Sequence, residues 1–185
     1  CGCHELATCD VLGIPVSGDL KELSFADLCT GTGCVGISIA NELVSHGLDV
    51  KGILTDISDT ALEVATCNLK ERFTCGSSLE VLRNDVAGDD LPGRFSFIVT
   101  NPPYITDKEM EELDGSVRDF EPEIALRGGP DGLALYESIA KKSFEALVPG
   151  GALFAEHGYK QGDGVREIFK AAGFKTVGTV KDYGN

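Results

Sequence analysis

The chain has 185 residues, with 16 lysines and arginines against 30 aspartates and glutamates, and a formal net charge of -14. This length suits one compact domain, and a fold of that size buries roughly 70% of the surface that its unfolded chain exposes, so it needs neither disulfides nor a metal. The excess of carboxylates argues against a broad surface for nucleic acid or an anionic membrane, because such binding depends on lysine and arginine neutralising phosphates. A cationic ligand or a basic protein is favoured instead.

The composition is that of a globular protein, with 42% hydrophobic and 25% charged residues. No uninterrupted apolar stretch approaches the roughly 20 residues of a membrane span, and the first residues lack the basic-then-apolar pattern of a signal peptide. We therefore expect a cytoplasmic protein without membrane attachment. The seven cysteines are odd in number, lie in the first half of the chain and include no CxxC pair, which does not resemble a secreted disulfide framework.

Residues 1–23 show no periodicity and are expected to be a lead-in segment, remnant or linker, ahead of one domain at 24–185. From there, short apolar runs that predict strands alternate with amphipathic segments that predict helices. In the first half we predict strands at 25–28, 50–55, 79–82 and 95–100, and helices at 35–44 and 60–73, the second with Ser58 and Asp59 as caps. The segment 101–130 is predicted to be a functional loop with at most a short helix near 107–113. After it we predict helices at 133–147 and 165–172 and strands at 152–156 and 175–180.

This alternation predicts an α/β fold with a Rossmann-like, mainly parallel and doubly wound sheet, whose ligands bind at the carboxyl ends of the strands. The turn after the first predicted strand holds Gly31, Gly33 and Gly36 in a GxGxxG pattern, and Asp56 closes the second strand. Such glycines let the backbone approach a ligand, and such an acid accepts hydrogen bonds from ribose hydroxyls. The pattern alone does not choose the cofactor, and a tight turn without a ligand is the alternative.

Two further carboxylates favour S-adenosylmethionine over NAD. Asp27 ends the first strand beside the glycines, where it would repel a pyrophosphate and attract a sulfonium and an ammonium group. Asp85 follows the third strand and suits the amino group of an adenine, although a turn residue is the alternative. We therefore predict S-adenosylmethionine as the cofactor and S-adenosylhomocysteine as the product.

The segment Asn101-Pro102-Pro103-Tyr104 follows the fourth predicted strand directly. Consecutive prolines fix two φ angles and remove two N–H donors, which leaves the nearby carbonyls rigidly oriented as acceptors. The Asn101 side chain and the Pro102 carbonyl can then accept both hydrogens of an NH2 group, while Tyr104 packs against a planar group. Methyl transfer to such a nitrogen needs alignment and electrostatics rather than a metal. A rigid turn is the alternative.

Several segments together resemble the release-factor glutamine methyltransferases, which methylate the side-chain amide nitrogen of the GGQ-loop glutamine in peptide chain release factors. The matching segments are DLCTGTGCVGISIANE at 27–42, TDIS at 55–58, NPPYI at 101–105, EPEIALRGGPDGLALY at 121–136 and EHGYKQ at 156–161. NPPY is shared with adenine-N6 methyltransferases of DNA, so it indicates the acceptor chemistry only, whereas the segment at 121–136 is more specific.

The resemblance implies roles at the matching positions. Cofactor-binding residues are expected at Asp27, Thr30, Gly31, Gly33, Asp56, Asp85 and Asn101, catalytic residues at Asn101, Pro102 and Tyr104, and substrate-binding residues at Asn101, Pro102, Pro103, Tyr104 and Glu121. The implied partner is a release factor, with no membrane and no direct nucleic-acid binding. No metal site is expected, since the histidines lack ligand spacing and the crowded Cys1, Cys3, His4 and Cys9 lack the spacing of closed zinc sites.

The sequence also departs from the family pattern. Cys29 replaces a frequent glycine, and neither the family's N-terminal helical domain nor its closing antiparallel strand is recognisable, so we expect the domain to be truncated at its ends. Two alternatives stay open: an amino-methyltransferase of a nucleic-acid base or another protein, and a non-catalytic fragment that binds S-adenosylmethionine. The acidic run of Glu109, Glu111 and Glu112 is interpreted as a solvated face, or else as an attraction for a basic release-factor surface.

Overall fold

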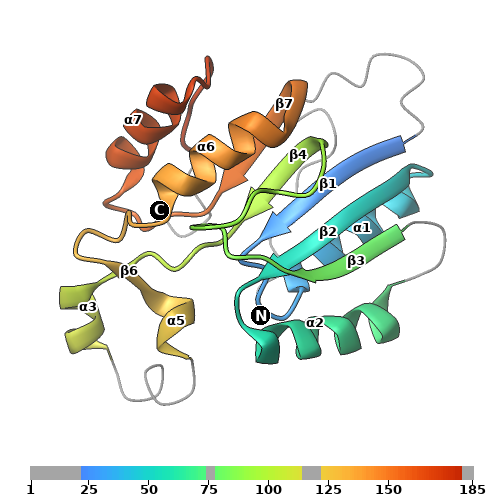
Figure 1. Cartoon of the computed structure of the whole chain (residues 1–185), viewed down its shortest axis with the longest axis horizontal. Helices are drawn as coiled ribbons and strands as arrows, with labels where there is room; N and C mark the ends of the chain where they lie inside the picture. Colours follow the sequence, from blue (N-terminus) through green and yellow to red (C-terminus); the bar gives the residue numbers. More distant parts are fainter. Residues whose placement is uncertain (1–21, 74–77, 114–121, 181–185) are drawn as a thin grey trace. The chain divides into compact units, whose positions relative to one another are not determined.

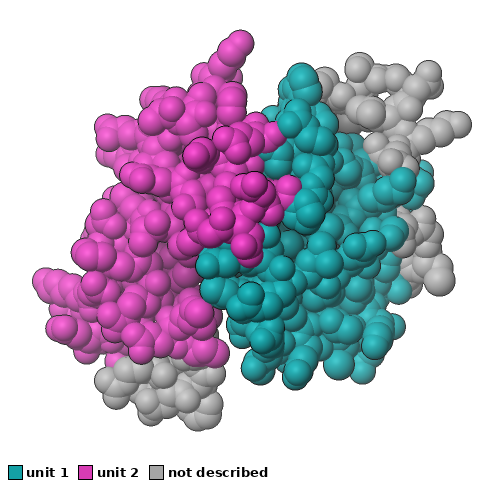
Figure 2. Space-filling view, in the orientation of Figure 1, with its two compact units in different colours: residues 1–85, 92–100, 146–154 teal, residues 86–91, 101–145, 155–185 magenta. Residues whose placement is uncertain are grey.

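A computed structural model describes residues 22–73, 78–113 and 122–180, and the chain divides into two compact units. The first unit contains residues 1–85, 92–100 and 146–154, and the second contains residues 86–91, 101–145 and 155–185 (Figure 2). Almost all of the predicted lead-in segment, with the crowded cysteines, lies outside the described residues, as does Glu121.

The first unit is built on a five-stranded sheet with the strand order β3-β2-β1-β4-β7 (Figure 1). Its strands are β1 Glu22–Leu28, β2 Asp49–Asp56, β3 Ser78–Arg83, β4 Phe95–Thr100 and β7 Leu147–Ala155. β1 pairs in parallel with β2 on one side and with β4 on the other, and β2 pairs in parallel with β3. The predicted parallel sheet of an α/β fold is therefore confirmed.

Two helices of the same unit pack against this sheet. Helix α1 spans Cys34–Ser45 and contacts β1 and β2, and helix α2 spans Asp59–Arg72 and contacts β2, β3 and α1. Ser58 caps α2 as predicted, because its hydroxyl accepts a hydrogen bond from the Ala61 N–H at 3.3 Å. Both helices begin directly after a loop at the carboxyl end of a strand.

The core between β1, β2, β4 and α1 is apolar and tightly packed. The rings of Phe25 and Phe97 stack with centroids 5.2 Å apart, and a Cβ atom at Gly52 would lie 2.4 Å from the Phe25 ring. This glycine therefore lets β2 pass the aromatic stack. The buried cluster comprises Leu23, Phe25, Ile39, Ala40, Leu43, Val50, Phe97 and Val99.

The second unit holds four helices and a small parallel pair of strands among its described residues. They are β5 Ile105–Thr106, α3 Asp107–Glu112, α5 Glu123–Leu126, β6 Arg127–Gly129, α6 Tyr136–Ala146 and α7 Gly162–Ala172. The predicted short helix near 107–113 is confirmed as α3, which begins with a capping box between Thr106 and Glu109. Helix α7 ends at Gly173, whose φ of +111° suits glycine.

Several details differ from the predicted elements. The strand predicted at 152–156 begins at Leu147, five residues earlier, and ends at Ala155. The loop at 101–130 contains α5 and the β5–β6 pair, which carry too few residues for any periodicity. The helix predicted at 133–147 begins at Tyr136, since the N–H groups of Leu133 and Ala134 bond to the Asp131 side chain and the Gly128 carbonyl. Residues 175–180 form no strand, because no strand among the described residues pairs with them, and Val180 is 96% exposed. Among the described residues, no helix has the length and apolar character needed to cross a membrane.

Candidate functional site

The strand order of the first unit sets the position of its ligand site. The chain runs outward from β1 to β2 and β3 and then returns to β4 on the opposite side of β1, which makes the carboxyl ends of β1 and β4 a topological switch point. The Thr100 hydroxyl joins these two ends by donating a 2.9 Å hydrogen bond to the Leu28 carbonyl. Ligands of open α/β sheets bind at such a point, which is where the sequence predicts the cofactor.

The three glycines of the loop after β1 have different roles. Gly31 has a φ of +55°, and a Cβ atom there would meet nothing within 4 Å, so this part of the backbone is open to a ligand. A Cβ at Gly36 would lie 2.2 Å from the Leu54 side chain and 2.8 Å from Asp27 Oδ2. Gly33, with a φ of +80°, is buried where α1 approaches α2. Of the three, Gly31 is thus suited to contact a ligand, and the other two allow close packing.

The Asp27 carboxylate holds this loop through hydrogen bonds. Its side chain is 2% exposed, and its Oδ2 atom accepts hydrogen bonds from the Thr30 hydroxyl at 2.6 Å and from the Gly36 N–H at 2.9 Å. Burial raises the pKa of Asp27 to about 6, and the nearby Asp56 adds to this increase, whereas the two hydrogen bonds oppose it. The carboxylate therefore fixes the loop conformation. Because it is buried, it can affect a ligand only through its electrostatic potential and through the positions of Thr30 and Gly36.

Asp56, at the end of β2, connects the glycine loop to the start of α2. Its Oδ2 atom accepts a hydrogen bond from the Gly31 N–H at 2.8 Å, and its Oδ1 atom accepts one from the Ser58 N–H at 2.9 Å. Each carboxylate oxygen has a second lone pair, so the same group can still accept hydrogen bonds from the hydroxyls of a ribose. Asp56 is half-buried, which suits a residue that holds the loop and also meets a ligand.

The charges of the three predicted acids all act on Cys29. Burial raises the pKa of the Cys29 thiol to about 12, and Asp56, Asp27 and Asp85 add to the increase, while a hydrogen bond with Thr100 opposes it. Cys29 adopts a φ of +55°, a conformation that favours glycine. A negative potential of this kind favours a cationic ligand such as S-adenosylmethionine and disfavours a pyrophosphate.

The Asn101-Pro102-Pro103-Tyr104 segment belongs to the second unit and follows Thr100, the last residue of β4, by one peptide bond. Asn101 is exposed, Pro102 is fully buried, and the other two residues are half-buried. The Tyr104 phenol donates a 3.1 Å hydrogen bond to Glu156, and the Tyr104 carbonyl accepts one of 2.8 Å from the Gln161 amide. The segment is therefore anchored at its proline and tyrosine, with the Asn101 amide at the surface.

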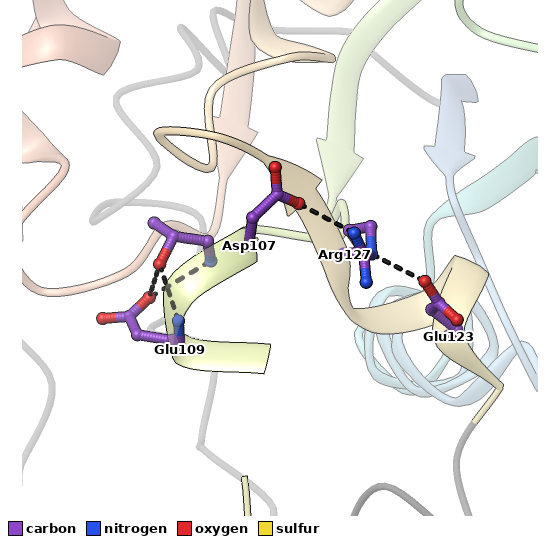
Figure 3. Close-up of polar contacts among 5 residues, drawn as sticks. Asp107, Glu109, Glu123 and Arg127 are labelled. Carbon is purple, nitrogen blue, oxygen red and sulfur yellow. Dashed lines mark hydrogen bonds and ion pairs between the residues drawn. The ribbon is translucent and has the colours of Figure 1, made fainter. Parts of the chain in front are cut away.

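The acidic segment beyond NPPY takes part in local contacts of the second unit (Figure 3). Arg127 pairs with Asp107 at 3.1 Å and with Glu123 at 2.7 Å, which ties α3 to α5. Glu109 accepts hydrogen bonds from the Thr106 hydroxyl and N–H, and these bonds lower the pKa of its carboxyl group. Glu111 and Glu112 are both exposed at the end of α3.

Four residues around NPPY have no role in the sequence-based prediction. Gln161 and Glu156 bond to Tyr104, as described, and Gly128 and Gly132 pack against the backbone at 103–104. All four lie in the segments EPEIALRGGPDGLALY and EHGYKQ. The resemblance of these segments to a family was the only feature of the sequence that could have indicated a role for them. Only the folded chain shows that both segments contact NPPY.

The strand order is that of the Rossmann-like α/β fold of class I S-adenosylmethionine-dependent methyltransferases. Solved structures with this fold include a putative class I methyltransferase from Listeria monocytogenes, with a TM-score of 0.55, 17% identity and coverage of 83% of this chain and 46% of that one. The ribosomal protein L11 methylase from Lactobacillus delbrueckii subsp. bulgaricus has a TM-score of 0.54, 19% identity and coverage of 88% and 65%. The chain belongs to the family described as the methyltransferase small domain, which matches residues 16–115.

Curated relatives extend the similarity beyond this match. The chain is 35% identical over 159 residues to the release factor glutamine methyltransferase of Clostridium acetobutylicum, covering 85% of this chain and 54% of that protein. The enzymes of the same name from Agrobacterium fabrum and Escherichia coli are 40% and 36% identical, over 85% and 86% of this chain and 53% and 55% of theirs. The chain thus spans about half the length of the curated relatives that it matches.

Proposed function

We propose that this chain methylates the side-chain amide nitrogen of the GGQ-loop glutamine of peptide chain release factors, with S-adenosylmethionine as methyl donor. The observation that carries the proposal is the identity of 35–40% over about 85% of the chain to proteins named release factor glutamine methyltransferases. A rigid NPPY segment directly after β4 supports it, because a primary amide presents two hydrogens to two acceptors. Because the proposed partner is a release factor, the cytoplasm is the proposed site of this activity.

In the proposed reaction, the Asn101 side chain and the Pro102 carbonyl accept the two N–H hydrogens of the glutamine amide. The nitrogen lone pair of an amide is delocalised, so the main contribution of these residues is to hold the nitrogen in line with the methyl group. The cofactor supplies an electrophilic methyl carbon on a sulfonium. Transfer would form a nitrogen–carbon bond and break the carbon–sulfur bond, with the nitrogen proton released to solvent and S-adenosylhomocysteine as the product.

The remaining binding roles are also proposals. Pro103 and Tyr104 line the substrate side, with Tyr104 oriented by its bond to Glu156, and Glu121 is proposed to shape the same pocket. On the cofactor side, Gly31 and Asp56 contact the ligand and Asp85 lies by the adenine, with Gly33 shaping the loop. Asp27 and Thr30 act as a hydrogen-bonded pair below the loop. Residues 24–185 constitute the proposed methyltransferase domain.

Transfer of a labelled methyl group to a purified release factor tests the proposal. The labelled product should form with the GGQ glutamine intact and should be absent when that glutamine is replaced by alanine. Asn101→Ala should lower kcat by on the order of 10²-fold or more, as loss of one preorganised polar contact does, with little change in the affinity for S-adenosylmethionine. Near-normal turnover of this variant, or label transferred to DNA or to a release factor without its glutamine, would reject the assignment.

A further inference from the structure

The side-chain amide of Gln161 bonds to three separate segments of the second unit. Its Nε2 group donates to the Tyr104 carbonyl at 2.8 Å and to the Asp131 carbonyl at 3.1 Å, and its Oε1 atom accepts from the Gly158 N–H at 2.8 Å. A glutamine amide has two N–H hydrogens, and both are used here on backbone carbonyls. The orientation of the amide is therefore fixed, because reversing it would place an N–H group against the Gly158 N–H.

Two glycines allow the surrounding backbone to come this close. A Cβ atom at Gly132 would lie 1.9 Å from Gln161 Nε2 and 2.2 Å from the Tyr104 carbonyl oxygen. A Cβ at Gly128 would lie 2.8 Å from both the Pro103 carbonyl oxygen and the Tyr104 Cα atom. The backbone at 103–104 is thus in close contact with the glycine-rich loop at 128–132 and with the Gln161 amide.

The Tyr104 residue is held at both of its polar ends. Gln161 fixes its backbone carbonyl, and Glu156 accepts a hydrogen bond from its phenol. The Glu156 carbonyl in turn accepts a 2.6 Å hydrogen bond from the phenol of Tyr136, which is fully buried. These contacts fix the carboxyl end of the NPPY segment, while its amino end continues directly from β4.

We propose that Gln161 is a positioning residue for methyl transfer, holding the NPPY carbonyls in the direction that the substrate amide requires. The inference rests on the proposed function, since it assigns to Gln161 an effect on that reaction. Glutamine is suited to this position because a glutamate of equal size would direct carboxylate oxygens at two carbonyl oxygens. An error of about 1 Å in the placement of reacting groups can lower a rate by about 10²-fold.

Two substitutions separate this role from a general structural one. Gln161→Glu keeps an acceptor for the Gly158 N–H and loses both donors, whereas Gln161→Ala loses all three bonds. If Gln161 positions NPPY, both variants should lower kcat about equally, by about 10-fold to 100-fold, with the dissociation constant of S-adenosylmethionine within about twofold of the unsubstituted chain. If Gln161 only supports the turn at Gly158, Gln161→Glu should retain normal kcat, which would overturn the proposal. Glu167→Gln, at an exposed position of α7, is the matched control.

Hydrogen exchange of the segment at 101–106 gives a second readout that does not depend on the substrate. Exchange there should be faster in Gln161→Glu than in the unsubstituted chain or in Glu167→Gln, and unchanged exchange would overturn the inference. If the unsubstituted chain fails to label a release factor, the proposed function is rejected, and the exchange result still decides whether Gln161 holds the segment. If labelling succeeds and Gln161→Glu has normal kcat, the inference alone is rejected.

Discussion

Replacement of Asp27 by asparagine should remove a pH-dependent cost from the folded state. The Asp27 carboxyl group is 2% exposed, and burial raises its pKa from 3.8 to about 6. The hydrogen bonds from Thr30 and Gly36 favour the ionised form, but they do not offset the loss of hydration. Asparagine has the same size, keeps one oxygen to accept these bonds and carries no charge.

The sign follows from the direction of the shift. Because the pKa is higher in the folded chain than in the unfolded one, the folded chain retains the Asp27 proton while the unfolded chain releases it. The stabilising contribution of this proton is complete below pH 3.8, declines as the pH rises and is lost above about pH 6. At about 1.4 kcal/mol for each pH unit, the free energy of unfolding falls by about 3 kcal/mol across this window.

Urea unfolding of the unsubstituted chain and of Asp27→Asn, from about pH 4 to about pH 8, measures this effect. The difference in the free energy of unfolding should shift by about 3 kcal/mol in favour of the variant over that range, because all other carboxylates titrate in both proteins and cancel. Asp49→Asn, at an exposed position, controls for the loss of one negative charge. A difference that stays constant to within about 1 kcal/mol would refute the reasoning.

Two further predictions concern packing. Gly36→Ala should destabilise the fold by about 1–3 kcal/mol, because its Cβ atom would lie 2.2 Å from Leu54. Gly178→Ala, whose Cβ would meet nothing within 4 Å, should change stability by less than about 0.5 kcal/mol, and equal effects in urea unfolding would contradict this. Phe97→Ala should cost about 3–5 kcal/mol, since its ring is 1% exposed and stacks on Phe25; a loss below about 1 kcal/mol in calorimetry would contradict the assigned core.

Most elements of the first unit could be predicted because they carry their own local signals. β4, Phe95–Thr100, is apolar at nearly every position, and α2 has both a helical period and a capping serine. Elements such as β5 and β6, of two and three residues, carry no period at all. Their pairing depends on the close approach of Gly128 to the backbone at 103–104, which is a contact between distant segments. At 175–180 the sequence has a local strand pattern but the structure has no strand. A strand also needs a neighbouring strand to pair with, and a local pattern of apolar residues does not supply one.

The site shows the same division. The sequence predicted that Asp27, Asp56 and Asp85 gather at the strand ends, because carboxyl ends of parallel strands share one edge of a sheet, and all three raise the pKa of Cys29. The direction of each side chain was beyond prediction. The Asp27 carboxylate accepts hydrogen bonds from Thr30 and Gly36. The Asp56 carboxylate accepts hydrogen bonds from the backbone N–H groups of Gly31 and Ser58. These orientations depend on the conformation of the loop, which a local sequence pattern does not predict.

The acids at the strand ends also connect stability to ligand binding. At neutral pH the ionised Asp27 is buried beside Asp56, and both burial and this second charge make ionisation unfavourable. In the proposed function a sulfonium and an ammonium enter this field, which favours the ionised form and lowers the pKa of Asp27. Part of the free energy that destabilises the ligand-free chain is therefore recovered when the cation binds, as expected where function and stability oppose each other. In the proposed function, the negative charge of Asp27 and Asp56 thus stabilises the chain with a bound cation relative to the ligand-free chain.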